Sequence, residues 1–164
     1  MAAYLRDLRC ILVVWLCAVT LAACAVRFAP DYDDEIVQSL NSHTEETSKF
    51  FAKIVGGTNR ADFSKRAETY ASLIGKYDAL ALRLEARAYP KPVLPGLLGG
   101  RSPVPSEAPS IAPVKKISAT LDQMKKFDQV RNISSIEIAA YRKIFEIETR
   151  NALTYENALK RDSK

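Results

Sequence analysis

Histidine and cysteine, the residues that most often carry catalysis and metal binding, are scarce in this sequence. The chain has 164 residues with 1 histidine, His43, and 3 cysteines, none of which follows Cys24. After Cys24 there is therefore no pair of cysteines for a disulfide, a redox motif or a thiolate metal site. Glu-x-x-His, His-Glu-x-x-His, Gly-x-Gly-x-x-Gly and P-loop motifs are also absent. We expect no catalytic residue, no metal site and no cofactor, and hence not an enzyme.

The chain also lacks segments typical of β-strands and a block of like charge. No stretch of useful length alternates between apolar and polar residues, as a half-buried strand does. The net charge of +5 is spread along the sequence, and opposite charges often stand four residues apart, as in Glu45–Lys49 and Glu146–Arg150. Such pairs are typical of solvated helix surfaces. We expect an all-α fold and no nucleic-acid partner.

The N-terminal part resembles the signal peptide of bacterial lipoproteins. Arg6 and Arg9 precede an apolar run from Cys10 to Val19, and small residues then lead to a cysteine in Leu21-Ala22-Ala23-Cys24. A basic, an apolar and a small-residue segment in this order are typical of an export signal that is removed. The last four residues are similar to the lipobox, which the lipoprotein signal peptidase recognises. The resemblance implies that residues 1–23 are removed and that Cys24 becomes the lipidated N-terminus.

If Cys24 is lipidated, the lipid bilayer is a partner of the protein, and the protein is located in the cell envelope. Several acyl chains on Cys24, palmitate among them, would give a permanent anchor. In bacterial lipoproteins, an Asp directly after the lipidated cysteine commonly retains the protein at the inner membrane. Ala25 stands at that position here, so the resemblance implies the periplasmic face of the outer membrane. Two alternatives remain: a retained signal anchor with the same orientation, and a secretory leader cut at a small-x-small site.

Two amphipathic helices are predicted before residue 90, from apolar residues spaced alternately four and three positions apart. The first starts at the acidic run Asp31–Glu35, which suits a helix N-terminus, and ends before Gly56-Gly57. Its stripe comprises Ile36, Leu40, His43, Thr47, Phe50 and Ile54, widened by Val37, Thr44, Phe51 and Val55. The second follows a cap at Thr58 or Asn59 and ends before Pro90. Its stripe comprises Phe63, Ala67, Tyr70, Ile74, Tyr77, Ala81, Leu84 and Ala88, widened by Leu73 and Leu80.

Prolines separate these helices from the rest. All of the 8 prolines except Pro30 lie between Pro90 and Pro113, so residues 90–113 can form neither a helix nor an interior strand. We expect a disordered or polyproline-like connector there. A third helix is predicted from Pro113 to just before Asn132, with Ile117, Leu121, Met124, Phe127 and Val130 on its stripe.

The fourth helix is predicted to begin at Ser134, which has the spacing of a capping box with Glu137, and to end near Lys160. One stripe holds Ile136, Ala140, Ile144 and Ile147, and beside it lie Tyr141, Phe145, Ala152, Tyr155 and Leu159. Because this apolar face is the widest, we expect it to be the most buried. Together the segments predict one antiparallel up-down bundle of four helices over residues 31–164, after a tether at residues 24–30. A three-helix bundle with residues 114–160 continuous is the alternative.

Beyond the lipobox, the order of elements resembles a group of small helical lipoproteins of proteobacteria that has no assigned activity. The similar segments are Tyr32-Asp33-Asp34-Glu35, Thr47–Phe51, the second helix with its tyrosines, and Ile133-Ser134 at the start of the last helix. The proline-rich connector departs from the group. The resemblance implies the fold and the anchor and adds no site.

The remaining candidate residues favour structural roles. His43 lies on an apolar stripe, where a hydrogen-bonded ring at the core edge is favoured over a catalytic base. For the run Asp31–Glu35, electrostatics at a helix start is favoured over calcium binding, because no glycine turn is nearby. We therefore hypothesise a non-catalytic structural or protein-interaction module that contacts another envelope protein. A periplasmic lipoprotein that binds a small ligand or an effector, as an inhibitor or exclusion factor does, is the alternative.

Overall fold

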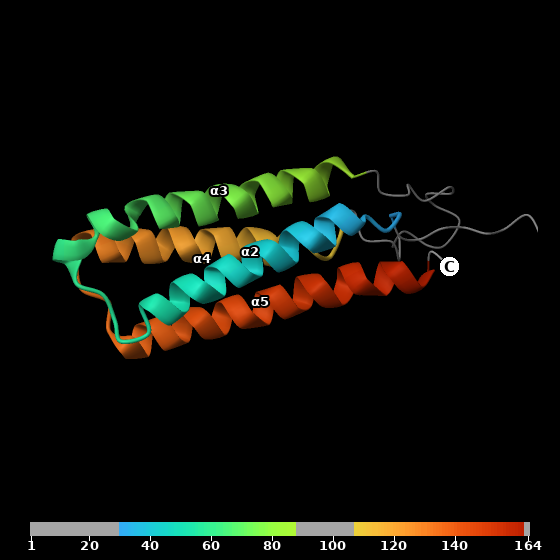
Figure 1. Cartoon of the computed structure of the whole chain (residues 1–164). Coiled ribbons are helices and arrows are strands. Elements are labelled where there is room, and N and C mark those ends of the chain that lie inside the picture. Colours follow the sequence, from blue (N-terminus) through green and yellow to red (C-terminus); the bar gives the residue numbers. More distant parts are fainter. Residues whose placement is uncertain (1–29, 88–106, 163–164) are drawn as a thin grey trace, which may run out of the picture.

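The computed structural model describes residues 30–87 and 107–162 (Figure 1). They form α2 (Asp34–Lys53), the 3-10 helix η1 (Arg60–Asp62), α3 (Ser64–Ala86), α4 (Ile111–Val130) and α5 (Ser135–Asp162). The predicted leader, the lipobox Leu21-Ala22-Ala23-Cys24 and residues 90–106 of the predicted connector lie outside the described residues.

The four long helices form an up-down bundle in which successive helices are antiparallel (Figure 1). α2 and α4 each contact both α3 and α5, so that the four helices close into a ring of neighbours. The predicted all-α class and four-helix bundle are confirmed. The three-helix alternative is wrong, because a break after Val130 separates α4 from α5. We call the end formed by residues 54–63 and 131–134 the loop end, and the end where α2 starts and α5 finishes the terminal end.

The acidic run starts α2, as predicted. The carboxylate of Asp33 accepts hydrogen bonds from the backbone N–H groups of Glu35 (2.9 Å) and Ile36 (3.3 Å). This side-chain cap satisfies donors that have no partner within the helix. Arg83 of α3 binds both Asp33 and Glu35. The run therefore begins one helix and ties it to the next.

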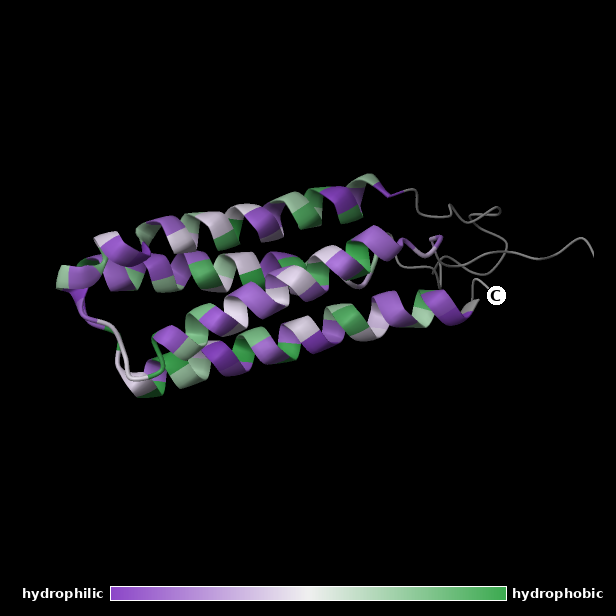
Figure 2. Ribbon diagram, in the orientation of Figure 1, coloured by the Kyte–Doolittle hydropathy of each residue, from purple (hydrophilic) through white to green (hydrophobic). Residues whose placement is uncertain are grey.

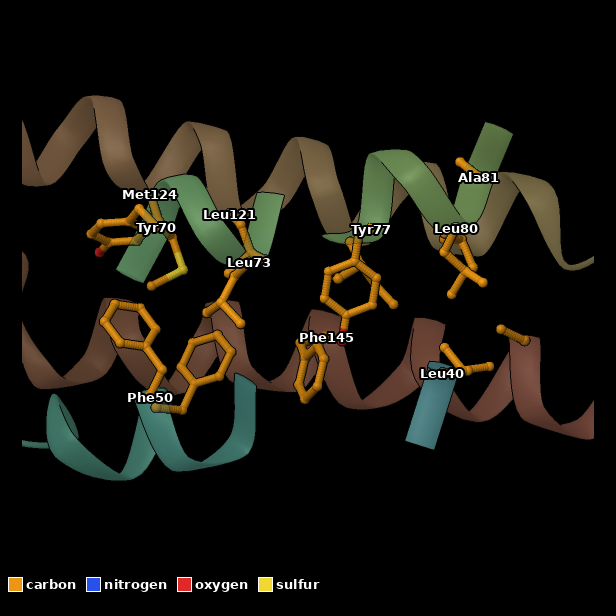
Figure 3. Packing of buried hydrophobic residues seen from close by; sticks show 14 of the residues in the cluster. Leu40, Phe50, Tyr70, Leu73, Tyr77, Leu80, Ala81, Leu121, Met124 and Phe145 are labelled. Carbon is orange, nitrogen blue, oxygen red and sulfur yellow. The ribbon is translucent and has the colours of Figure 1, made fainter. Parts of the chain in front are cut away.

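Aromatic side chains of α2 and α3 fill the centre of the bundle (Figure 3). Tyr70 and Tyr77 are both fully buried, and the Tyr70 ring meets the Phe50 ring edge-on with centroids 4.8 Å apart. The Phe51 ring meets the Phe145 ring of the neighbouring helix α5 at a tilt, with centroids 5.6 Å apart. Burial raises the pKa of Tyr77 to about 12. The central part of the predicted stripe is therefore core. Tyr70, Tyr77, Ala81 and Leu84 are buried, Phe63, Ala67 and Ile74 are partly buried, and Ala88 lies outside the described residues.

The two connections at the loop end bind each other. The backbone N–H of Thr58 donates to the carbonyl of Ile133 (2.8 Å), and the N–H of Ile133 donates to Oγ1 of Thr58 (3.1 Å). Gly57 stands beside them with φ of +103°, a conformation that other residues adopt only with strain. A Cβ at this position would lie 2.8 Å from the Ile133 carbonyl oxygen. Asn59, one of the two predicted caps, accepts the N–H of Ala61 and so caps η1.

α4 begins at Ile111, two residues before its expected start. Pro113 still lies in the first turn, where a missing N–H costs nothing because no carbonyl is available to receive it. Ser110 precedes the helix without capping it, and its hydroxyl donates instead to Glu156 of α5.

Two buried ion pairs join helices at opposite ends of the bundle. Toward the loop end, Arg66 of α3 donates to both oxygens of Asp128 on α4, at 2.7 and 2.8 Å. At the terminal end, Arg87 donates to both oxygens of Glu156 on α5, each at 2.9 Å. Both carboxylates are 0% exposed. A buried charge is tolerated only with its partner in place, so these pairs fix how the helices are turned toward one another.

The capping box predicted at the start of α5 is confirmed. The N–H and the hydroxyl of Ser134 donate to the Glu137 carboxylate at 2.9 and 2.8 Å, and the N–H of Glu137 donates back to Ser134 Oγ at 3.3 Å. Arg131 binds the same carboxylate at 2.7 Å. The Arg131 guanidinium, together with the donors of Ser134, lowers the pKa of Glu137 to about 2.

The wide apolar face predicted for α5 is buried only in part: Phe145, Ala152 and Leu159 are buried as expected, whereas the prediction is wrong for the isoleucine stripe. Ile136, Ile144 and Ile147 are 81%, 36% and 44% exposed, and Ala140 is exposed as well. The buried face instead carries a residue at every seventh position: Ile138, Phe145, Ala152 and Leu159. That series is apolar along the whole helix, whereas the isoleucine stripe continues into polar residues in the second half. A full-length apolar seam buries more apolar area and so favours this rotation of α5, which the enclosure of Glu156 by Arg87 also requires.

Two valines at helix ends also differ from the prediction. Val55 and Val130 were expected on apolar stripes but are 60% and 63% exposed. Val55 follows the end of α2, and Val130 is the last residue of α4, so neither is covered by a neighbouring helix turn.

Replacement of Gly57 tests the packing of the loop end. Gly57→Ala should lower the free energy of unfolding by about 2 kcal/mol, because alanine is strained at positive φ and its Cβ would meet a backbone carbonyl. Urea unfolding followed by circular dichroism measures this change. Gly56→Ala is the matched control, since no atom lies within 4 Å of its added Cβ. Equal effects of the two substitutions would contradict the described loop geometry.

Removal of the buried carboxylate tests the ion pair at the terminal end. Glu156→Ala should lower the free energy of unfolding by about 3–5 kcal/mol, because Arg87 is left without a counter-charge. Glu146→Ala, on the same helix, breaks the exposed pair with Arg142 and should cost less than about 0.5 kcal/mol. The double replacement Arg87→Met with Glu156→Leu should recover most of the loss. A small effect of Glu156→Ala alone would show that this carboxylate is not buried.

Candidate interaction face

One side of α5 is apolar over its first half and faces solvent. This outer face of α5 consists of exposed residues that follow one another along the helix: Ile136, Ala140, Ile144, Ile147, Asn151, Thr154 and Ala158. Figure 2 shows hydrophobic and hydrophilic residues interspersed along α5. The isoleucines of the outer face are exposed, whereas the series that begins at Ile138 is buried. Exposed apolar stripes that continue over several turns mark interaction surfaces more often than isolated exposed residues do.

The outer face is held outward by contacts on the opposite side of the helix. Glu156 is bound by Arg87 and Ser110 near one end of α5, and the Phe145 ring packs against the Phe51 ring of α2. Turning the isoleucines inward would break both contacts and expose Phe145. The face is therefore a rigid feature of the bundle.

The charged residues responsible for this rotation were not foreseen from the sequence. A signal was present: Glu156 lies between Ala152 and Leu159, which belong to the buried series of α5. A carboxylate within an apolar stripe indicates a buried partner of opposite charge. Its partner Arg87 lies on another helix and could not be identified from sequence spacing.

His43 lies half-buried on α2. Its ring meets the Tyr77 ring edge-on, with centroids 5.7 Å apart. Burial lowers the pKa of His43, the Lys76 cation lowers it further, and Glu46 acts in the opposite direction. The ring lies at the edge of the core, as expected. The expected hydrogen bond is not found at its Nδ1, which has no partner among the described residues.

The other candidate residues are engaged in packing or capping. Tyr70 and Tyr77 are buried and Phe63 is packed against the core, so the seam of the second helix is not free to bind a partner. In the acidic run, Asp33 caps α2 and pairs with Arg83. Within residues 30–87 and 107–162, no group of three His, Cys, Asp or Glu residues could hold a metal ion.

An open hollow of about 390 Å³ lies between α2 and α3, and His43 is not among its lining residues. Phe50 and Leu73 are among its lining residues, which are otherwise mainly charged or polar: Glu46, Lys49, Lys53, Lys65, Glu68, Thr69 and Ser72. Ligand sites usually enclose most of their ligand and are lined mainly by apolar side chains. The hollow therefore does not favour the alternative of a ligand-binding protein.

Cys24 and the other lipobox residues, Leu21, Ala22 and Ala23, lie before the first described residue. Among the helices of the described part, none is long and apolar enough to cross a membrane. No protein-family model, curated protein or solved structure matches the chain.

Titration of His43 gives a test of its surroundings. Because folding lowers the pKa of His43, protonation opposes folding, and the free energy of unfolding should fall as the pH decreases through about 6.5. Urea unfolding of the wild type should therefore show lower stability at about pH 5.5 than at about pH 7.5. His43→Phe keeps the ring contact with Tyr77 and should remove most of this difference. The same pH dependence in both proteins would contradict the assignment to His43.

Proposed function

We propose that the protein is a lipid-anchored protein of the cell envelope, facing the periplasm from the outer membrane, in which the helical bundle is a non-catalytic structural or protein-interaction module. The anchor is supported by the lipobox at Cys24 and by the basic and apolar segments that precede it. The interaction role is carried by one observation, the solvent-exposed outer face of α5.

The geometry of the bundle suits a short anchor. The first described residue, Pro30, leads into α2 at the terminal end, and α5 finishes at the same end (Figure 1). From Cys24 to Pro30 the chain takes 30 − 24 = 6 steps, which span at most roughly 20 Å. An acylated Cys24 would thus hold the terminal end within roughly 20 Å of the bilayer.

The buried charges support a structural use of the bundle. Asp128 and Glu156, the acidic side chains with 0% exposure, are each bound by an arginine from another helix. Carboxylates that act as acids or bases must reach a substrate. These two are enclosed between helices and hold them together.

Exposure of the isoleucines is costly for a single soluble domain. A fully exposed isoleucine forgoes about 1.5–3 kcal/mol of burial, and Ile144 and Ile147, at 36% and 44% exposed, forgo part of that amount. A partner that covers the outer face of α5 recovers part of this free energy. Because the face runs along the bundle, a partner would contact it side-on.

The anchor is tested by replacing the residue that carries it. In a bacterium that processes lipoproteins, we expect the wild type in the membrane fraction, with the leader removed and several acyl chains on Cys24. Cys24→Ser should abolish acylation and release the protein from the detergent phase. Mass spectrometry of the intact product and phase partition in a non-ionic detergent give the two measurements.

Cys17→Ser is the matched control, because this cysteine lies within the leader and leaves the lipobox intact. It should behave as the wild type does. An intact leader or a free thiol at Cys24 in the wild type would overturn the proposed anchor.

A further inference from the structure

The outer face of α5 has the spacing of a coiled-coil seam. From Ala140 its members recur at alternating intervals of four and three residues: Ala140, Ile144, Ile147, Asn151, Thr154 and Ala158. In a heptad written abcdefg this places Ala140, Ile147 and Thr154 at d, and Ile144, Asn151 and Ala158 at a. All six are exposed. The seam is therefore available to another helix.

Charges of opposite sign flank this seam. At 100° per residue, Lys143 and Arg150 project on one side, about 60–80° from the seam, and Glu148 projects on the other. Lys143 and Arg150 thus occupy g positions, and Glu148 occupies an e position. Lys143 and Glu148 form no ion pair with any residue that the structure describes. By contrast, Arg142 on the same helix is paired with Glu146.

This arrangement of charge discriminates between possible partners. When two copies of α5 pair in parallel, a g residue faces the e residue five positions later on the other copy, so Lys143 meets Glu148 twice per dimer. In an antiparallel pair, g faces g, and the basic residues of the two copies repel one another. The polar residue Asn151 falls at an a position, where a buried Asn sets the register of parallel pairs.

We propose that the outer face of α5 binds the same face of a second copy, in parallel and in register, to form a dimer whose twofold axis runs along the bundle. The seam supplies the apolar contact, and two Lys143–Glu148 pairs set the orientation. The proposal rests on the interaction role proposed above, and the proposed anchor would add to the pairing by confining both copies to one surface.

A parallel dimer is compatible with one membrane surface. Its axis runs along the bundles, so both terminal ends point the same way, and two anchors at Cys24 could enter one bilayer. Confinement to that surface raises the effective concentration of the second copy. A seam with small and polar residues at several positions then suffices for pairing.

Disulfide trapping tests the dimer in the full-length chain. Cys10 and Cys17 are replaced by alanine, and single cysteines are introduced as Ala140→Cys, Ile147→Cys or Thr154→Cys, with Cys24 either kept or replaced by serine. Under mild oxidation, each of the three d positions should give a disulfide-linked dimer on a non-reducing gel. In an antiparallel pair, a disulfide between identical positions could form at one of the three positions at most. Ser72→Cys, exposed on the non-adjacent helix α3, is the control and should stay monomeric.

Reversing the charge of Lys143 tests the orientation, because parallel and antiparallel dimers predict opposite changes in the cross-linked fraction. Lys143→Glu places two acids at each pairing site of a parallel dimer and should lower the cross-linked fraction at position 147 by about threefold to tenfold. Lys143→Glu combined with Glu148→Lys should restore it. In an antiparallel dimer, Lys143→Glu would remove repulsion and raise cross-linking.

Each outcome either supports or overturns the proposal. Cross-links at all three d positions in the protein that keeps Cys24 support the proposal, whether or not they also form in the Cys24→Ser protein. Absence of self-cross-links while Cys24 is acylated overturns the dimer and leaves the anchor intact. A cross-link to a different protein would retain the interaction role and refute self-association.

Discussion

The enclosure of Glu156 between helices is the constraint on which the rest of the structure depends. Its carboxylate is bound by both Nη groups of Arg87 at 2.9 Å and by the hydroxyl of Ser110. Glu156 lies on α5, Arg87 directly follows α3, and Ser110 directly precedes α4. Since a buried charge requires its partner, this cluster fixes the rotation of α5 at the terminal end. The pair of Arg66 with Asp128 does the same for α3 and α4 toward the loop end.

The functional proposals follow from that rotation. With Phe145 and Glu156 turned inward, Ile144 and Ile147 must face solvent. The bundle then carries one side-facing apolar strip and brings the start of α2 and the end of α5 to one end (Figure 1). The proposed tether at that end and the proposed contact strip along the side would be complementary. The tether would position the bundle relative to a surface, and the strip would let neighbours on that surface meet.

The sequence predicted helices well because each has strong local signals. The capping box of Ser134 and Glu137, the acidic start of α2 and the spacing of Tyr70 and Tyr77 act within a few residues and survive folding unchanged. The isoleucine stripe of α5 was wrongly predicted to be buried together with Phe145, Ala152 and Leu159, because both series are apolar and the sequence alone does not separate them. Partners such as Arg87, distant in sequence, decided between them. Local spacing holds no information about such tertiary contacts.

The rotation of α5 can be tested most directly by introducing a charge at each of two adjacent positions in separate variants. Urea unfolding of Ile144→Lys and Phe145→Lys compares the outer and the inner side of one helix turn. Our account predicts that Ile144→Lys changes the free energy of unfolding by less than about 1 kcal/mol, because Ile144 is 36% exposed on the outer side of α5 and the end of a lysine side chain can reach water from there. Phe145→Lys should cost more than about 4 kcal/mol or prevent folding, since it removes a core ring and buries an unpaired charge. The reverse order would contradict the account.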